Sequence, residues 1–397
     1  MNSKLLPIIL FLLAATACGE HKEETPQNKI NELKELVKKT PDDPEAHYKL
    51  GSSYLAFENY QEAVGQFKDT VRLNKEHAQA YRDMGVAYFY SNQLDEAEKW
   101  LKKSYNLNNK DPGPLTSLGG ILISIGHNVE ALKYLNGALT KEGNHVNTYN
   151  NLGAAYVNLS QFDKALTQLK KAVELDEQNP TAHNNLGALY ERSNKMSKAI
   201  EEYTKAIQLD PKYSAAHYNL GVIFAKDKQY SQALSEWKKT LELNPNDSYA
   251  HAALGWIYDR ENNKDGALRE YKTALQINPS DAVTLNAVGK IYLGSGRVKE
   301  AIDIFEKSIN LKQNYVDAYY NLSVAYDGAQ NGTKAIVNTL VAQKIYQYKK
   351  NAAMLETVNS NLKLFYSKYR LAPNDFKDVA LPTIIQELEK RPTAQSK

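Results

Sequence analysis

Histidine is the residue type whose spacing in this chain first suggests chemistry. His183, His217 and His251 lie 34 residues apart, and His47 occupies the same position in that period. A shared zinc ion would need imidazole nitrogens about 2.0–2.1 Å from it. Equivalent positions of stacked helices lie about 8–10 Å apart, so these rings cannot surround one ion. The histidines are therefore predicted to pack between helices, and we expect no metal, no cofactor and no catalytic residue.

The single cysteine, Cys18, directly follows a short apolar segment. Residues 5–17 are apolar except for Pro7 and Thr16, a length that suits a secretory signal but is too short to span a bilayer. Small residues at 14–17 precede the cysteine, and the segment resembles the bacterial lipobox, in which the cysteine carries a diacylglyceryl group. We predict a lipoprotein signal peptide at 1–17, lipid attachment at Cys18 and a flexible tether at 18–29.

The location of the protein is predicted from the same resemblance. Gly19, rather than an aspartate, follows the cysteine, which favours anchoring to the outer membrane of a bacterial cell envelope. The alternative is ordinary signal cleavage beside an incidental cysteine.

A 34-residue period organises the rest of the chain. Glycine recurs eight times at this spacing, and alanine stands twelve residues after each glycine position in all nine units. The glycines are Gly51, Gly85, Gly119, Gly153, Gly187, Gly221, Gly255 and Gly289, and Ser323 takes the ninth position. The alanines are Ala63, Ala97, Ala131, Ala165, Ala199, Ala233, Ala267, Ala301 and Ala335. Small residues at fixed positions let two helices approach closely, which predicts a stack of helix pairs.

This pattern resembles the tetratricopeptide repeat, a 34-residue pair of antiparallel helices. The unit Asn185-Leu186-Gly187-Ala188-Leu189-Tyr190, followed by Ala199, Tyr203, Ala206 and Pro211, shows the motif. The resemblance implies an all-α fold, a right-handed α-solenoid of helix-turn-helix units with capping helices. We expect a capping helix within 30–43, nine repeats over 44–349, and capping helices with a tail over 350–397. A closing helix is expected at 352–370 and a last short one from Pro382.

One stripe of the first helices is predicted to bind a partner. In this family the stripe lines a concave groove, and from the third repeat to the eighth it holds no acidic residue. The candidate groove residues are Asn151, Asn185, Asn219, Arg192, Lys226, Trp256, Arg260 and Lys290. The asparagines match positions that resemble the peptide-holding ones of the O-linked N-acetylglucosamine transferase. Glu191 and Asp259 flank the basic residues and are candidates to neutralise part of them. Close contact between neighbouring helices is the alternative explanation of the stripe.

The predicted function is that of a lipid-anchored scaffold in envelope assembly or maintenance. The partner is expected to be a protein segment with acidic residues or a free C-terminal carboxylate. Basic and acidic side chains nearly cancel at a net charge of +3, so we expect no nucleic-acid partner. The alternative is a glycosyltransferase-like enzyme or its accessory subunit, but the 48 residues after the repeats are too few for a nucleotide-sugar domain.

Overall fold

The computed structural model describes residues 26–142 and 145–376, and these residues are all helical or in turns. They form twenty α-helices and one short 3-10 helix, with no strand in the described ranges. The chain divides into two units, residues 1–227 and 228–397. The predicted signal peptide, Cys18 and the helix expected from Pro382 lie outside the described residues.

The helices of the first unit include one capping helix and eleven repeat helices. They are α1 (Pro26–Lys39), α2 (Pro44–Ala56), α3 (Tyr60–Leu73), α4 (Ala78–Tyr90), α5 (Leu94–Leu107), α6 (Gly113–Ser124), α7 (Asn128–Leu139), α8 (Val146–Asn158), α9 (Phe162–Leu175), α10 (Pro180–Arg192), α11 (Met196–Leu209) and α12 (Ser214–Lys226).

The helices of the second unit continue the same alternation. They are α13 (Tyr230–Leu243), α14 (Ser248–Arg260), α15 (Lys264–Ile277), α16 (Ala282–Gly294), α17 (Val298–Leu311), α18 (Val316–Gly328), α19 (Gly332–Tyr348) and α20 (Ala352–Tyr369), followed by the 3-10 helix η1 (Pro373–Phe376). None of the helices in the described part of the chain is long and apolar enough to cross a membrane.

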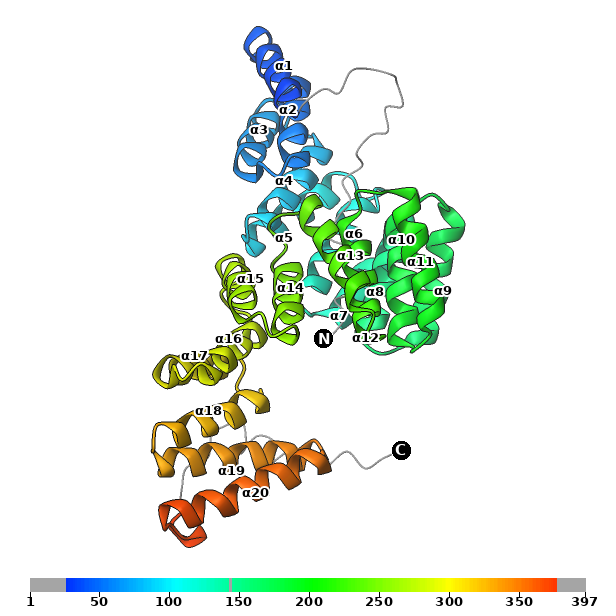
Figure 1. The fold of residues 1–397 in the computed structure, drawn as a ribbon. Coiled ribbons are helices and arrows are strands. Elements are labelled where there is room, and N and C mark those ends of the chain that lie inside the picture. The colour runs from blue at the N-terminus through cyan, green and yellow to red at the C-terminus, as the bar shows by residue number, and fades with distance from the viewer. Residues whose placement is uncertain (1–25, 143–144, 377–397) are drawn as a thin grey trace. The chain divides into compact units, whose positions relative to one another are not determined.

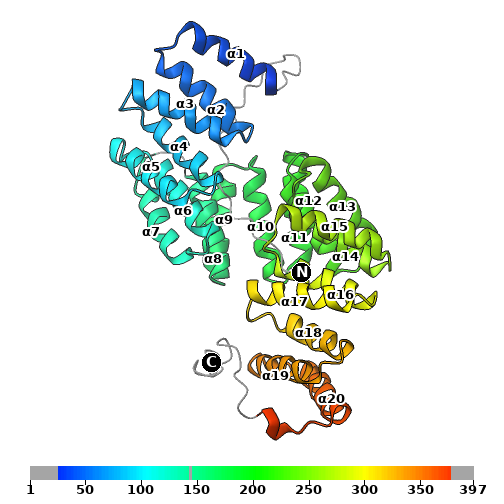
Figure 2. The same ribbon diagram turned by 90° about the vertical axis from the view of Figure 1, so that its left-hand side faces the viewer.

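Consecutive helices within each unit pack against one another as an α-solenoid (Figures 1 and 2). Helices α2 to α11 form five successive pairs and α14 to α19 form three, all at the predicted positions, while α12 ends the first unit and α13 begins the second. The closing helix α20 packs on α19 and confirms the expected helix at 352–370. Helix α1 begins at Pro26, four residues before the predicted cap, so helix occupies the end of the predicted tether. Proline is well tolerated at a helix start, which explains this earlier boundary.

The glycine and alanine positions do what the sequence predicts. All nine alanines of the period are fully buried, with no exposed surface. A Cβ atom added to Gly187 would lie 2.8 Å from the ring of Tyr203, and one added to Gly85 would lie 2.8 Å from Leu101 Cγ. Each of these glycines therefore makes room for a large side chain sixteen residues later on the second helix of its pair.

The turn between the two helices of each repeat contains one residue with a left-handed backbone conformation. The sequence analysis did not predict this feature. The positive-φ positions recur every 34 residues: Glu58, Asn92, Gly126, Ser160, Asn194, Lys228, Asn262, Gly296 and Gln330. Left-handed backbone costs most non-glycine residues about 1–2 kcal/mol, with asparagine tolerated better. The recurrence of Asn and Gly at this spacing is the sequence signal that could have located the turn.

The Ser160→Gly substitution is expected to stabilise the fold. Ser160 is exposed at φ 59°, so glycine relieves the backbone without removing buried surface. Because glycine also loses more freedom on folding, we expect a net gain of about 0.5–1 kcal/mol, measured by urea denaturation. The matched control is Gly126→Ala at φ 86°, where nothing lies within 4 Å of the added Cβ. That variant should lose stability by a similar amount, and equal stability of all three proteins would contradict the explanation.

Candidate partner-binding surface

The candidate groove residues all lie on first helices of repeats. In the first unit, Asn151 is on α8, Asn185 and Arg192 are on α10, and Asn219 and Lys226 are on α12. In the second unit, Trp256 and Arg260 are on α14 and Lys290 is on α16. The 34-residue register therefore places equivalent residues on equivalent helices within each unit.

The asparagine row is buried between first helices. Asn151, Asn185 and Asn219 expose 4%, 2% and 1% of their surface. The Asn151 side-chain amide donates to the carbonyl oxygen of Thr116 on α6 at 3.3 Å. That of Asn219 donates to Asn184 Oδ1 on α10 at 3.0 Å. In this structure the row serves contact between helices, the alternative that the sequence left open, and a ligand has no access to it.

Some amide atoms of this row, and of the adjacent Asn150, have no hydrogen-bond partner among the residues that the structure describes. They are Asn151 Oδ1, Asn185 Nδ2, Asn219 Oδ1 and both side-chain polar atoms of Asn150, all buried. Buried polar atoms are normally paired with protein or with ordered water, because an unpaired one costs about 1–3 kcal/mol. The row is therefore a line of buried polar groups between first helices of the first unit, and not part of an apolar core.

Polar bonds between successive first helices share one spacing. Five of them, in the described residues, join side chains to groups 35 positions away, one more than the repeat length. They are Tyr48 to Asp83, Asn151 to Thr116, Asn219 to Asn184, Lys226 to Glu191, and Asn321 to Asn286. These bonds lie at four junctions between first helices, those of α2 with α4, α6 with α8, α10 with α12 and α16 with α18, and the α10–α12 junction has two of them.

One of these bonds neutralises a member of the basic row. Lys226 Nζ lies 2.5 Å from Glu191 Oε1, and the Glu191 side chain is fully buried. The Tyr203 hydroxyl donates to the other carboxylate oxygen at 3.0 Å. Burial, followed by the charge of Glu191, raises the pKa of Tyr203 well above its ordinary value, so the hydroxyl remains a donor. Glu191 therefore does neutralise part of the row, whereas Asp259 pairs with Lys264 at 2.6 Å.

Arg260 lies instead among aromatic rings of the second unit. Its guanidinium carbon is 4.6 Å from the ring centre of Tyr230 and 5.1 Å from that of Trp256. The two rings meet edge to face at 5.8 Å. An arginine over aromatic faces is held by cation–π attraction, which leaves its charge available to a partner. Tyr230 begins α13, so an inspection of first helices alone could not find it.

Exposed apolar side chains lie on the same first helix as Trp256 and Arg260 and on the first helix of the next repeat. Tyr249 and Val283 occupy the same repeat position on α14 and α16 and expose 39% and 54% of their surface. Spacings of seven and four residues place Tyr249, Trp256 and Arg260 on one side of α14, and a spacing of seven places Val283 and Lys290 on one side of α16. We call these five residues the docking surface. Arg192, in the first unit, is exposed separately.

Comparison with known protein families identifies the repeats. Models described as tetratricopeptide repeat match residues 30–67, 48–112, 214–247, 248–281 and 282–315, and a model described as TPR repeat matches 155–194 and 192–228. These matches together cover more than half of the chain. The α-solenoid is therefore built of tetratricopeptide repeats, and the chain belongs to the tetratricopeptide repeat family. Such repeats indicate a protein-interaction scaffold.

Solved structures show the same fold at low sequence identity. The human IFIT1 dimer with PPP-AAAA is 18% identical with a TM-score of 0.55, and the match covers 80% of this chain and 77% of that one. The human IFIT1 dimer with m7Gppp-AAAA is 17% identical with a TM-score of 0.57, over 80% and 77% of the two chains. No curated protein matches the chain.

Proposed function

We propose that this protein is a lipid-anchored scaffold that binds an acidic segment of a partner protein on the docking surface. The observation behind the proposal is an arginine held over the rings of Tyr230 and Trp256, with exposed Tyr249 on the same helix and exposed Val283 at the equivalent position of the next first helix. Aromatic residues and arginine dominate binding energy at interfaces. Arg260 and Lys290 supply positive charge, so a complementary segment carries acidic residues next to an apolar anchor.

A site-specific crosslinker tests this surface in intact cells. A photo-reactive phenylalanine analogue at Val283 should capture a protein, and the captured segment should contain acidic residues. The same analogue at Leu311, which is 48% exposed at the end of α17, is the matched control and should not capture it. Equal capture from both positions, or a captured segment without acidic residues, would count against the proposal.

RNA is a further outcome of the same experiment. The human IFIT1 structures contain PPP-AAAA and m7Gppp-AAAA, but their likeness to this chain is one of fold alone. The near-neutral charge of the chain favours a protein partner over nucleic acid. Excess PPP-AAAA should therefore leave the Val283 crosslink unchanged, and its loss would indicate that nucleic acid binds there.

The anchor is tested separately through its cysteine. If Cys18 carries the lipid, Cys18→Ala should prevent incorporation of labelled fatty acid and move the protein out of the membrane fraction. Fractionation and labelling in a bacterium that processes lipoproteins give both readouts. A variant that is still labelled and still partitions with membranes would overturn the lipid anchor, without bearing on the docking surface. The envelope role belongs to the same proposal, and a partner from envelope assembly would support it.

A further inference from the structure

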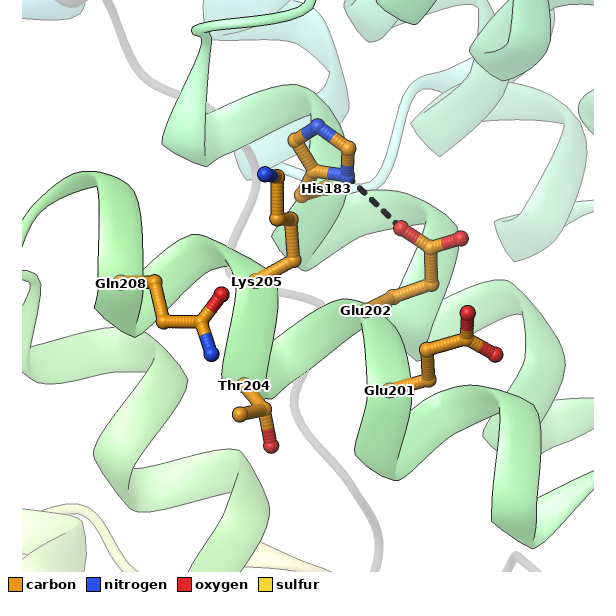
Figure 3. A pocket seen from close by; sticks show the side chains of 6 residues that line it. All are labelled: His183, Glu201, Glu202, Thr204, Lys205 and Gln208. Carbon is orange, nitrogen blue, oxygen red and sulfur yellow. Dashed lines mark hydrogen bonds and ion pairs between the residues drawn. The ribbon is translucent and has the colours of Figure 1, made fainter.

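His183 connects three parts of the fold through its two ring nitrogens. Its Nδ1 lies 2.7 Å from Glu202 Oε2 on α11, and its Nε2 lies 3.2 Å from the carbonyl oxygen of Glu177. Glu177 belongs to the turn that joins α9 to α10. Figure 3 shows the imidazole of His183 directed at Glu202. The ring therefore joins α10 to its partner helix and to the turn before it.

Both partners of this ring are hydrogen-bond acceptors. A backbone carbonyl only accepts, and an ionised carboxylate also only accepts. A neutral imidazole carries one N–H, so it can donate to one of these oxygens but not to both. Only the protonated ring, with an N–H on each nitrogen, satisfies both contacts at once.

The charged groups around His183 come mainly from α11. Glu202 is its direct partner, while Glu201 and Lys205 line the same pocket of about 500 Å³ with Thr204 and Gln208. The hydrogen bond that His183 donates to Glu202 raises the pKa of His183, helped by the bond to the Glu177 carbonyl, while burial and Lys205 act in the opposite direction. The net direction is upward, which agrees with the geometry.

The same contacts recur in other repeats and provide an internal comparison. His251 lies 2.8 Å from Glu270 through Nδ1 and 3.1 Å from the Pro245 carbonyl oxygen through Nε2. His47 lies 2.8 Å from Gln66 Oε1 and 3.0 Å from the Pro41 carbonyl oxygen. A glutamine amide can turn its NH₂ toward the ring, so the contact of His47 with Gln66 is satisfied by a neutral imidazole.

We propose that His183 and Glu202 form a protonation-dependent clamp, in which the imidazolium holds α10, α11 and the preceding turn together and its deprotonation releases one of the two contacts. Because the contacts fix a repeat to the turn that precedes it, release loosens the packing between repeats. The clamp is independent of the docking surface and of the lipid anchor.

The direction of the pH effect follows from the raised pKa of His183. Its contribution to stability is fully present below the ordinary histidine value of about 6.5, provided that Glu202 is ionised. The contribution is lost as the pH rises through the pKa of the folded protein. The first unit should therefore be held more tightly at mildly acidic pH than at alkaline pH.

The Glu202→Gln variant of the full chain tests the clamp by loss. We expect the His183 titration midpoint, followed by NMR of the ring, to fall toward about 6.5. The gap in thermal midpoint between wild type and variant should be widest near pH 6 and shrink toward pH 9. Far-UV circular dichroism establishes that the variant folds.

The Gln66→Glu variant tests the clamp by gain, because it places a carboxylate beside His47. The thermal midpoint of this variant should gain a dependence on pH that favours mildly acidic conditions, while the titration midpoint of His183 should not move. The clamp is overturned if the His183 titration midpoint is unchanged in Glu202→Gln, or if the thermal midpoint of Gln66→Glu depends on pH in the same way as that of wild type. It is also overturned if wild type and Glu202→Gln show the same dependence of thermal midpoint on pH.

Discussion

Replacing Lys226 by methionine is expected to destabilise the first unit by about 3 kcal/mol. Methionine retains most of the apolar stem but leaves the buried Glu191 carboxylate without its ammonium partner. Removing one partner of a buried ion pair typically costs about 3–5 kcal/mol, and the partial exposure of Lys226 places the effect at the low end. Local hydrogen exchange in α10 and α12, together with urea denaturation, measures the loss.

Two variants separate the buried charge from other effects of the substitution. Adding Glu191→Gln to Lys226→Met should recover much of the stability, because the neutral amide can still accept from the Tyr203 hydroxyl. The matched control is Lys264→Met, which breaks the more exposed pair with Asp259 and should cost less than about 1 kcal/mol. Equal losses in Lys226→Met and Lys264→Met would show that the burial of Glu191 does not matter.

The Trp256→Ala variant is expected to weaken binding of the crosslinked partner by about 30-fold, equivalent to about 2 kcal/mol. The substitution removes a large ring from the docking surface and one of the two rings that hold Arg260. Titration calorimetry with the captured segment measures the loss. We expect Arg260→Glu to weaken binding as well, with a reduced salt dependence, because the segment is acidic.

Trp100→Ala is the matched control for this binding experiment. Trp100 is also half-buried and stacks on a tyrosine, Tyr81, but it lies on the second helix α5 of another repeat. Its removal should leave the affinity unchanged. If Trp100→Ala and Trp256→Ala weaken binding equally, the effect comes from the general stability of the solenoid. Unchanged affinity in both Trp256→Ala and Arg260→Glu would place the partner elsewhere.

The repeat register and helix positions could be predicted from sequence, because a strict 34-residue period fixes which residues are equivalent. Gly187 and Ala199 were correctly expected at tight helix contacts, and both lie in such contacts. The period could not predict how far an individual side chain is buried. Helical spacing places Asn185 and Trp256 on corresponding sides of their helices, yet the first is buried and the second is half-exposed. That difference depends on how closely neighbouring helices approach.

Contacts between a first helix and a second helix also could not be predicted from the sequence. Tyr230 reaches Arg260 from a second helix, and Glu202 reaches His183 across its repeat. Both histidine–glutamate pairs, His183 with Glu202 and His251 with Glu270, are 19 residues apart, a regularity visible in the sequence. This spacing indicates a contact between the two side chains only once the antiparallel pairing of the two helices is known.

Some side-chain bonds join successive first helices through residues that lie 35 positions apart in the sequence. These bonds limit which repeats the protein could lose without losing a bond. Arrays of equal repeats tend to gain or lose whole units when recombination misaligns them. Here the junctions that carry such a bond differ in chemistry, for example Tyr48 with Asp83 and Lys226 with Glu191. Deleting the repeat that holds Asp83 would leave the Tyr48 hydroxyl without that acceptor, and deleting the repeat that holds Lys226 would leave the Glu191 carboxylate facing a new neighbour. These bonds thus favour the present order of the repeats at the junctions where they occur.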